Sequence, residues 1–186
     1  MRKEIVVAGF GGQGIILMGV ILARVVEYFD DLHVAQTQSY GPVSRGGACR
    51  TDVVLSDREI NYPKCTKPDL MIFMSEESVA RYIREADPEK AIITYDNTLI
   101  SKIDNAYKYA FTVPATKMAE ECLKNRIVAN MFMLAANIDL ILKDSFELLK
   151  EVVKKSVPKK SMEINLKALE MGYEYGTKNI HHKGIM

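Results

Sequence analysis

The stretch Ile5–Leu17, IVVAGFGGQGIIL, joins a short apolar run to a cluster of glycines and then to a segment with helical apolar periodicity. This order predicts a strand, a tight loop and a helix. Gly9, Gly11 and Gly14 fit the spacing G-x-G-x-x-G, which in this context indicates a phosphate- or dinucleotide-binding loop. Glycines permit sharp turns and close approach of a ligand or of another backbone. The following helix would direct its free N–H groups and its positive dipole end at whatever binds there.

The chain beyond the glycines completes a strand–helix–strand unit but lacks one residue of a dinucleotide site. The pattern predicts a helix over 12–29 and a short strand over 33–36. A dinucleotide site has an acidic residue at the end of this second strand, about twenty residues past the glycines, which binds the ribose hydroxyls. Here the corresponding residues are Gln36–Ser39. The missing acid makes a nicotinamide or flavin dinucleotide the less favoured interpretation.

A second unusual segment, residues 36–50 (QTQSYGPVSRGGACR), follows in place of the acid. Its polar and glycine-rich composition predicts a long loop, and loops of this length are usually functional or disordered. The side chains of Arg45 and Arg50 offer planar donors for a carboxylate or a phosphate, beside Gly46 and Gly47, which allow close approach. The plain alternative is a surface loop whose arginines are only solvated.

The rest of the chain predicts one α/β domain with a helical C-terminal third. Two strands, 51–55 and 59–62, are expected to form a hairpin, which makes the sheet mixed but mostly parallel. Further strands are expected at 69–74, 91–95 and 107–112, and helices at 75–85, 114–123, 126–143, 144–157 and 161–175. The expected fold is a single Rossmann-like three-layer domain over residues 1–176, followed by a flexible tail over 177–186.

Composition excludes several classes of function. The 186 residues are 48% hydrophobic with a net charge of +1, which gives no reason to expect nucleic acid or a membrane surface as a partner. The start of the chain has no signal-like segment, so a cytoplasmic protein is expected. The odd and widely spaced cysteines Cys49, Cys65 and Cys122 predict no metal site and no iron–sulfur cluster in this chain. Two asparagines in the apolar helix, Asn130 and Asn137, are expected either to bond loop backbone or to hold the glycine loop in shape.

Together the two glycine motifs carry a family resemblance. Gly9–Gly14 (GFGGQG) and Ser39–Gly47 (SYGPVSRGG) resemble those of the gamma subunits of the 2-oxoacid:ferredoxin oxidoreductases, most of all the 2-oxoglutarate members. Val113–Thr116, Ala129–Met131 and Asn165–Ala168 also resemble that family, so that the likeness runs from residue 4 to about residue 176.

The resemblance implies that the chain is one subunit of a larger enzyme and is inactive alone. Such complexes decarboxylate a 2-oxoacid on thiamine diphosphate with Mg, pass electrons through iron–sulfur clusters to ferredoxin, and release an acyl-CoA. The implied partners are thiamine-binding and ferredoxin-like subunits, which carry those cofactors, and no cofactor is expected to be tightly bound to this chain. A homodimer of the isolated chain is left open.

In this interpretation the chain completes or caps the active-site region of its partners, and no residue has a catalytic role. The loops would contact a phosphate, such as that of coenzyme A, or a partner's backbone. The expected contact residues are Gly9, Gly11, Gly12, Gln13, Gly14, Tyr40, Arg45, Gly46, Gly47 and Arg50.

Two other functions are open at this point. A free-standing nucleotide-binding oxidoreductase would bind NAD(P) as an isolated chain. In a non-catalytic assembly module, the glycines would only permit tight packing against other subunits.

Overall fold

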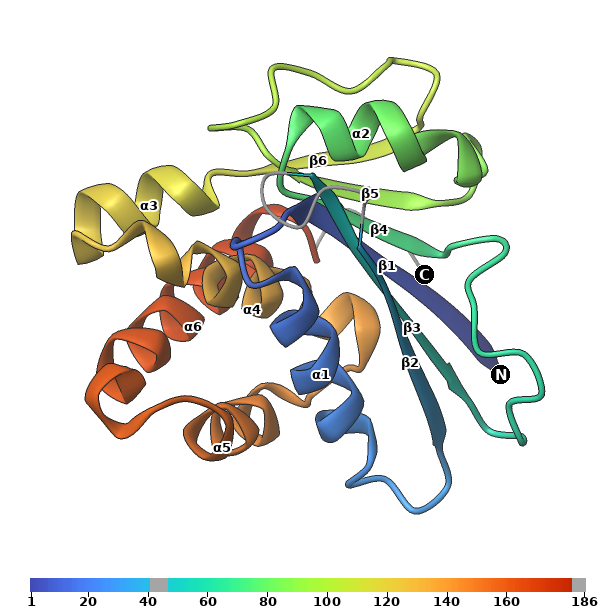
Figure 1. Ribbon diagram of the computed structural model, residues 1–186, viewed down its shortest axis with the longest axis horizontal. Coiled ribbons are helices and arrows are strands. Elements are labelled where there is room, and N and C mark those ends of the chain that lie inside the picture. The colour runs from blue at the N-terminus through green and yellow to red at the C-terminus, as the bar shows by residue number, and fades with distance from the viewer. Residues whose placement is uncertain (41–46, 182–186) are drawn as a thin grey trace.

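The computed structural model describes residues 1–40 and 47–181, and it contains a six-stranded sheet in the order β2-β3-β1-β4-β5-β6 (Figure 1). The strands are β1 (Arg2–Phe10), β2 (His33–Tyr40), β3 (Ala48–Ser56), β4 (Leu70–Phe73), β5 (Ile92–Asp96) and β6 (Tyr109–Val113). The α-helices are α1 (Ile15–Val26), α2 (Glu76–Tyr82), α3 (Ala115–Leu123), α4 (Ala129–Ile141), α5 (Phe146–Ser156) and α6 (Lys159–Asn179), with short 3-10 turns η1 (Ile83–Glu85) and η2 (Arg126–Val128).

The sheet has a parallel half and an antiparallel half. Strands β1, β4, β5 and β6 are parallel neighbours, whereas β3 runs antiparallel to both β1 and β2. The predicted mixed, mostly parallel sheet is therefore confirmed. The carboxyl ends of the four parallel strands meet at one edge of the sheet, which is where open α/β sheets bind ligands.

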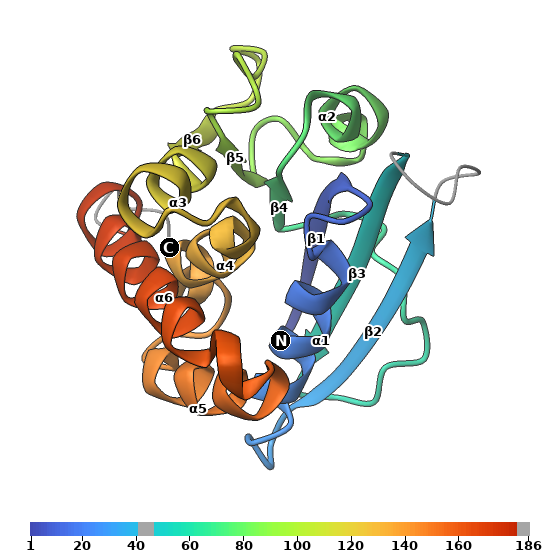
Figure 2. The same ribbon diagram turned by 60° about the vertical axis from the view of Figure 1, so that its left-hand side comes forward.

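Helices cover both faces of the sheet, which confirms the three-layer α/β fold. Ile5 and Val7 of β1 face the core that α1, α4, α5 and α6 share, and Val6 and Ala8 face the smaller core beneath α2. Figure 2 shows α2 on one side of the sheet and the other helices on the opposite side. Because side chains of a strand alternate between the two faces, a central strand must be apolar at every position. This explains why residues 5–8 are an unbroken apolar run.

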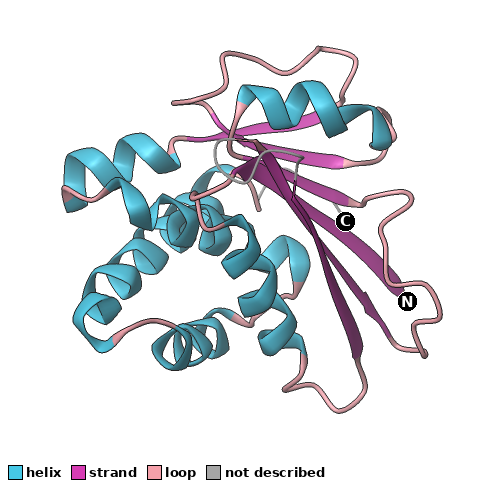
Figure 3. Ribbon diagram, in the orientation of Figure 1, coloured by secondary structure: helices cyan, strands magenta, loops and turns pink. Residues whose placement is uncertain are grey.

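The hairpin predicted over residues 51–62 is wrong. Strand β3 extends from Ala48 to Ser56, and residues 57–69 form an irregular connection that Figure 3 draws as a loop. The side chain of Glu4 accepts hydrogen bonds from the backbone N–H groups of Thr66 and Lys67. These bonds satisfy backbone groups of the connection without a strand partner. The antiparallel pairing of this sheet comes instead from β3, which pairs with both β1 and β2.

The end of the last helix also differs from the expectation. Helix α6 continues past residue 175 to Asn179, and Ile180 is fully buried against the main core. The segment 177–181, expected to begin a flexible tail, is therefore helical as far as Asn179 and packed at Ile180. Residues 182–186 of that expected tail lie outside the described residues.

Candidate functional site

The glycine loop joins β1 to α1 and has a shape that side chains would obstruct. Gly12 and Gly14 have φ angles of 103° and 76°, in the left-handed region that favours glycine. A Cβ atom on Gly9 would lie 2.5 Å from Gln13 Oε1, and one on Gly14 would lie 2.1 Å from Asn130 Nδ2. The predicted strand–loop–helix arrangement is thus present, and its geometry favours glycine at residues 9, 12 and 14.

The side chain of Gln13 connects this loop to the sheet by two hydrogen bonds. Its Oε1 atom accepts a hydrogen bond of 2.6 Å from the backbone N–H of Phe10, and its Nε2 atom donates one of 2.8 Å to the carbonyl of Met74, just after β4. Both polar ends of the side chain are therefore engaged within the protein. The expected ligand contact of Gln13 stays a prediction, and the observed role of its side chain is to shape the loop.

The two predicted loops do meet, but the second is mostly strand. Residues 36–40 belong to β2 and residues 48–50 to β3, so the long loop predicted over 36–50 is wrong. A polar strand at the edge of a sheet needs no apolar run, and this is why its sequence resembles a loop. The backbone N–H of Gly11 donates to the carbonyl of Gly47 at 3.2 Å, which places the two motifs side by side.

The structure leaves part of the second motif undescribed. Arg45 and Gly46, both expected site residues, lie outside the described residues. Tyr40 is the last residue of β2 and pairs with Cys49 of β3. The ligand contacts proposed for these three residues stay predictions.

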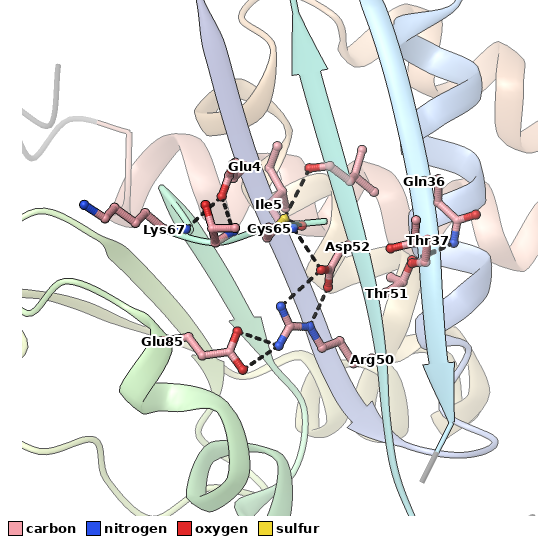
Figure 4. Close-up of polar contacts among 12 residues, drawn as sticks. Glu4, Ile5, Gln36, Thr37, Arg50, Thr51, Asp52, Cys65, Lys67 and Glu85 are labelled. Carbon is pink, nitrogen blue, oxygen red and sulfur yellow. Dashed lines mark hydrogen bonds and ion pairs between the residues drawn. The ribbon is translucent and has the colours of Figure 1, made fainter. Parts of the chain in front are cut away.

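Arg50 makes an ion-pair triad on the α2 face of the sheet (Figure 4). Its guanidinium donates to Asp52 at 2.5 Å and to Glu85 of η1 at 2.6 Å, and it lies 5.2 Å from the centre of the Tyr82 ring. Burial by itself lowers the pKa of Arg50, but the hydrogen bonds to Asp52 and Glu85 outweigh burial, so the pKa lies above its usual value. The expected anion contact of Arg50 stays a prediction that this geometry disfavours, because its charge is already neutralised by two carboxylates.

A cavity missed by sequence reasoning lies beside the glycine loop. It has a volume of about 160 Å³ and is lined by Gly12, Gln13, Met74, Thr116, Arg126, Ile127 and Ala129. These residues follow β1 and β4, or belong to the start of α3 after β6, to η2 and to the start of α4, so the cavity lies at the carboxyl ends of the parallel strands. We call this set of residues the glycine-loop cavity.

Arg126 is the cation of the glycine-loop cavity. Its side chain is 60% exposed, and the carboxylate of Glu120 lies 3.5 Å away. Helix α1 begins just after Gly14, and glycine has no side chain that could cap the helix. The first turn of α1 also contains no acidic residue. Uncapped N–H groups and a positive helix end favour an anion. The sequence signal that could have found Arg126 is its place three residues before Ala129–Met131, one of the segments that resemble the family.

Of the two core asparagines, one lies against the glycine loop. Asn130 is buried and its side chain is next to Gly14, whereas the expectation that the two asparagines hold the loop in shape stays a prediction. Asn137 is fully buried seven residues further along α4, and its Nδ2 atom donates to the carbonyl of Met133 in the same helix.

The cysteines do not form a cluster site. Cys49 and Cys65 are buried, and burial raises the pKa of both thiols. Cys122 is exposed. Over residues 1–40 and 47–181, no group of three or more His, Cys, Asp or Glu side chains could hold a metal ion. In the same part of the chain, no helix is both long and apolar enough to cross a membrane.

Comparisons with known proteins agree with this architecture. The family model described as pyruvate ferredoxin/flavodoxin oxidoreductase matches residues 4–175. A 2-oxoglutarate synthase subunit KorC of Methanocaldococcus jannaschii is 42% identical over 176 residues, which cover 94% of each chain. The corresponding subunit of Methanothermobacter marburgensis is 40% identical over 94% of this chain and 96% of its own.

A solved structure shares both sequence and fold with this chain. The gamma subunit of a keto/oxoacid ferredoxin oxidoreductase from Geobacter sulfurreducens is 30% identical with a TM-score of 0.81, and the match covers 96% of this chain and 98% of that one. Family model, relatives and structure all match nearly the whole chain. The chain therefore belongs to the pyruvate ferredoxin/flavodoxin oxidoreductase family.

Proposed function

We propose that this chain is the gamma subunit of a 2-oxoglutarate:ferredoxin oxidoreductase, an enzyme that oxidatively decarboxylates a 2-oxoacid to an acyl-CoA. The observation that carries this proposal is the end-to-end similarity to 2-oxoglutarate synthase subunits, at 40% and 42% identity over 94% of this chain. The gamma-subunit structure from Geobacter sulfurreducens, which has nearly the same extent, supports it. Thiamine diphosphate, Mg and the iron–sulfur clusters belong to the partner subunits.

Two features of this chain bear on where those cofactors lie. An iron–sulfur cluster is held by several cysteine thiolates that lie close together. Cys49 and Cys65 are buried with raised thiol pKa values, and the described residues hold no group of metal ligands. The described part of this chain therefore does not fit a cluster, and the electrons pass through the partner subunits.

The role proposed for this chain is to close the active-site region of its partners and to contact an anionic group there. The glycine-loop cavity supports this role, because it combines the uncapped start of α1 with the exposed cation of Arg126. A phosphate of coenzyme A is the anion that the reaction supplies. A carboxylate or backbone carbonyl of a partner subunit would satisfy the same donors. We therefore expect Arg126 to contact the anion, since Arg50 already has two carboxylate partners.

The strand order disfavours a free-standing dinucleotide enzyme. In the dinucleotide fold the second strand lies next to the first, and its end reaches the ribose. Here β3 lies between β1 and β2, so the end of β2 is displaced by one strand from the glycine loop. The acid required at that position is also absent from Gln36–Ser39.

The proposed function is tested by reconstitution. The chain would be co-expressed with candidate thiamine-binding and ferredoxin-like subunits, and coenzyme A-dependent reduction of ferredoxin would be measured with 2-oxoglutarate and with pyruvate. We expect activity with 2-oxoglutarate only when this chain is present. Full activity without the chain would contradict a role in the enzyme, and activity with pyruvate alone would contradict the substrate.

The role of the cavity is tested at Arg126. In the reconstituted enzyme, Arg126→Ala is expected to raise the Michaelis constant for coenzyme A roughly tenfold or more, because a charge-assisted hydrogen bond contributes about 1.5–3 kcal/mol. Arg126→Lys should recover part of the loss. Arg58→Ala removes an exposed arginine beyond the end of β3 and serves as the matched control. An unchanged Michaelis constant in a fully assembled Arg126→Ala enzyme would remove Arg126 from the site.

A further inference from the structure

A polar groove lies on the α2 face of the sheet, over β2 and β3. Residues paired across two strands share a face, so Thr37 lies on the same side as its partner Asp52 and as Val54, which belongs to the core beneath α2. Among the described residues, that core contains none from β2. The groove has a volume of about 370 Å³, which is typical of a site for a small molecule. This α2-face groove is lined by residues of the two strands, of the connection 57–69, and of α2 and η1, among them Thr37, Ser39, Arg50, Lys64, Arg81 and Glu85.

The two carboxylates of the groove are already bound to one buried cation. Arg50 is 9% exposed and donates to both oxygens of Asp52, at 2.5 and 3.1 Å, and to both oxygens of Glu85, at 2.7 and 2.6 Å (Figure 4). The backbone N–H of Cys65 also donates to Asp52. Neither carboxylate is therefore free to attract a cationic ligand, and Arg50 serves to connect β3 with η1.

Two other cations of the groove have no such partner. Lys64 lies in the connection and Arg81 on α2, and both side chains are exposed. Over residues 1–40 and 47–181, neither forms an ion pair, and the hydroxyls of Thr37 and Ser39 form no hydrogen bond. The groove thus contains unused donors and an excess of positive charge. Such a surface favours an anion with several acceptor oxygens.

Tyr82 holds Arg81 at the groove. The Tyr82 ring is 8% exposed, and its centre lies 5.4 Å from the guanidinium carbon of Arg81 and 5.2 Å from that of Arg50. A cation is attracted to the face of an aromatic ring at such distances. Arg81 is therefore partly ordered before any ligand binds, which lowers the entropic cost of binding.

We propose that the α2-face groove binds a short dicarboxylate, with one carboxylate on Arg81, the other on Lys64, and the hydroxyls of Thr37 and Ser39 as further donors. Two cations on separate elements match an anion whose charges lie at its two ends. A compact anion such as phosphate leaves most of the volume of about 370 Å³ unfilled. The groove shares no lining residue with the glycine-loop cavity. This proposal goes beyond the proposed function and does not depend on it.

The test is isothermal titration calorimetry on the isolated full-length chain at low ionic strength. Succinate is the dicarboxylate probe, butyrate is a monocarboxylate with the same number of carbons, and inorganic phosphate is the compact dianion. We expect succinate to bind more tightly than either of the others. Arg81→Ala and Lys64→Ala are each expected to weaken succinate binding roughly tenfold or more, because each removes a charge-assisted hydrogen bond.

The matched controls are Arg84→Ala and Lys67→Ala. Both residues are exposed close to Arg81 and Lys64 in the sequence, but neither lines the groove, so succinate binding is expected to stay unchanged. Circular dichroism would verify that every variant is folded.

Four results would overturn the proposal. The first is a wild-type chain that binds no succinate in the millimolar range. The second is butyrate or phosphate binding as tightly as succinate, which would mean that two separated charges are not recognised. The third is succinate binding that Arg81→Ala and Lys64→Ala weaken no more than the controls do. The fourth is succinate binding that is lost in Arg126→Ala and kept in Arg81→Ala, which would assign the anion to the glycine-loop cavity.

Discussion

At the scale of single residues, Glu4 is a buried carboxylate with a structural role. It is 5% exposed, and its two oxygens accept hydrogen bonds from Arg2 Nε at 2.9 Å and from the backbone N–H groups of Thr66 at 2.6 Å and Lys67 at 2.9 Å. Burial alone would raise the pKa of Glu4, but these hydrogen bonds together outweigh it and lower the pKa below its ordinary value. The ionised side chain therefore fastens the connection 57–69 to β1.

The lowered pKa of Glu4 predicts a pH-dependent effect of Glu4→Gln. A carboxyl group with a depressed pKa in the folded state stabilises the protein above its unfolded pKa, and this stabilisation is lost as pH falls through the folded value. We expect Glu4→Gln to lower the free energy of unfolding by about 1–3 kcal/mol at neutral pH and by less near pH 3. Urea unfolding at the two pH values measures this. Glu59→Gln, at an exposed position of the same connection, is the control. An equal loss of the free energy of unfolding at both pH values would contradict the lowered pKa of Glu4.

At the scale of elements, apolar periodicity predicted the strands and helices that have a buried apolar face. It missed the segments whose residues lie mostly at the surface. The strands β1, β4, β5 and β6 and the helices of the C-terminal third lie close to their predicted ranges, because their buried faces have a clear period. The polar strand β2 resembled a loop, since an edge strand exposes much of its surface. The last turn of α6 resembled a frayed tail, since Ile180 is the one apolar and buried residue among the described residues beyond it.

The docking of the end of α6 is tested by Ile180→Ala. Ile180 is 0% exposed, so its truncation removes buried methyl groups and leaves a cavity. We expect a loss of about 2–4 kcal/mol in the free energy of unfolding. Ile127→Ala makes the same change at a residue that is 79% exposed and should alter stability by less than about 0.5 kcal/mol. Chemical denaturation of the two variants decides the matter, and a small effect at both positions would mean that residue 180 is not packed in solution.

At the scale of the whole molecule, the site is assembled from segments that are distant in the sequence. The glycine-loop cavity is lined by residues that follow β1, β4 and β6 and by residues of η2 and the start of α4, which lie up to about 115 residues apart. The sequence indicated its first part, Gly12 and Gln13, because glycine spacing is a local signal. It did not indicate Arg126 as the nearby cation. It placed Arg50 in the site, whereas the fold directs that side chain to two carboxylates on the α2 face.

The sequence alone determined the fold class, the glycine turn and the family, since each depends on the order and spacing of residues along the chain. Only the tertiary structure decided which polar groups share a surface. The tertiary fold placed β3 between β1 and β2, brought Arg126 to the cavity beside the glycine loop and paired Arg50 with Asp52 and Glu85. It also left β2 at one edge of the sheet, paired with β3 alone among the described strands. Hydrogen bonds and ion pairs depend on distance in space, and local sequence patterns do not encode that distance.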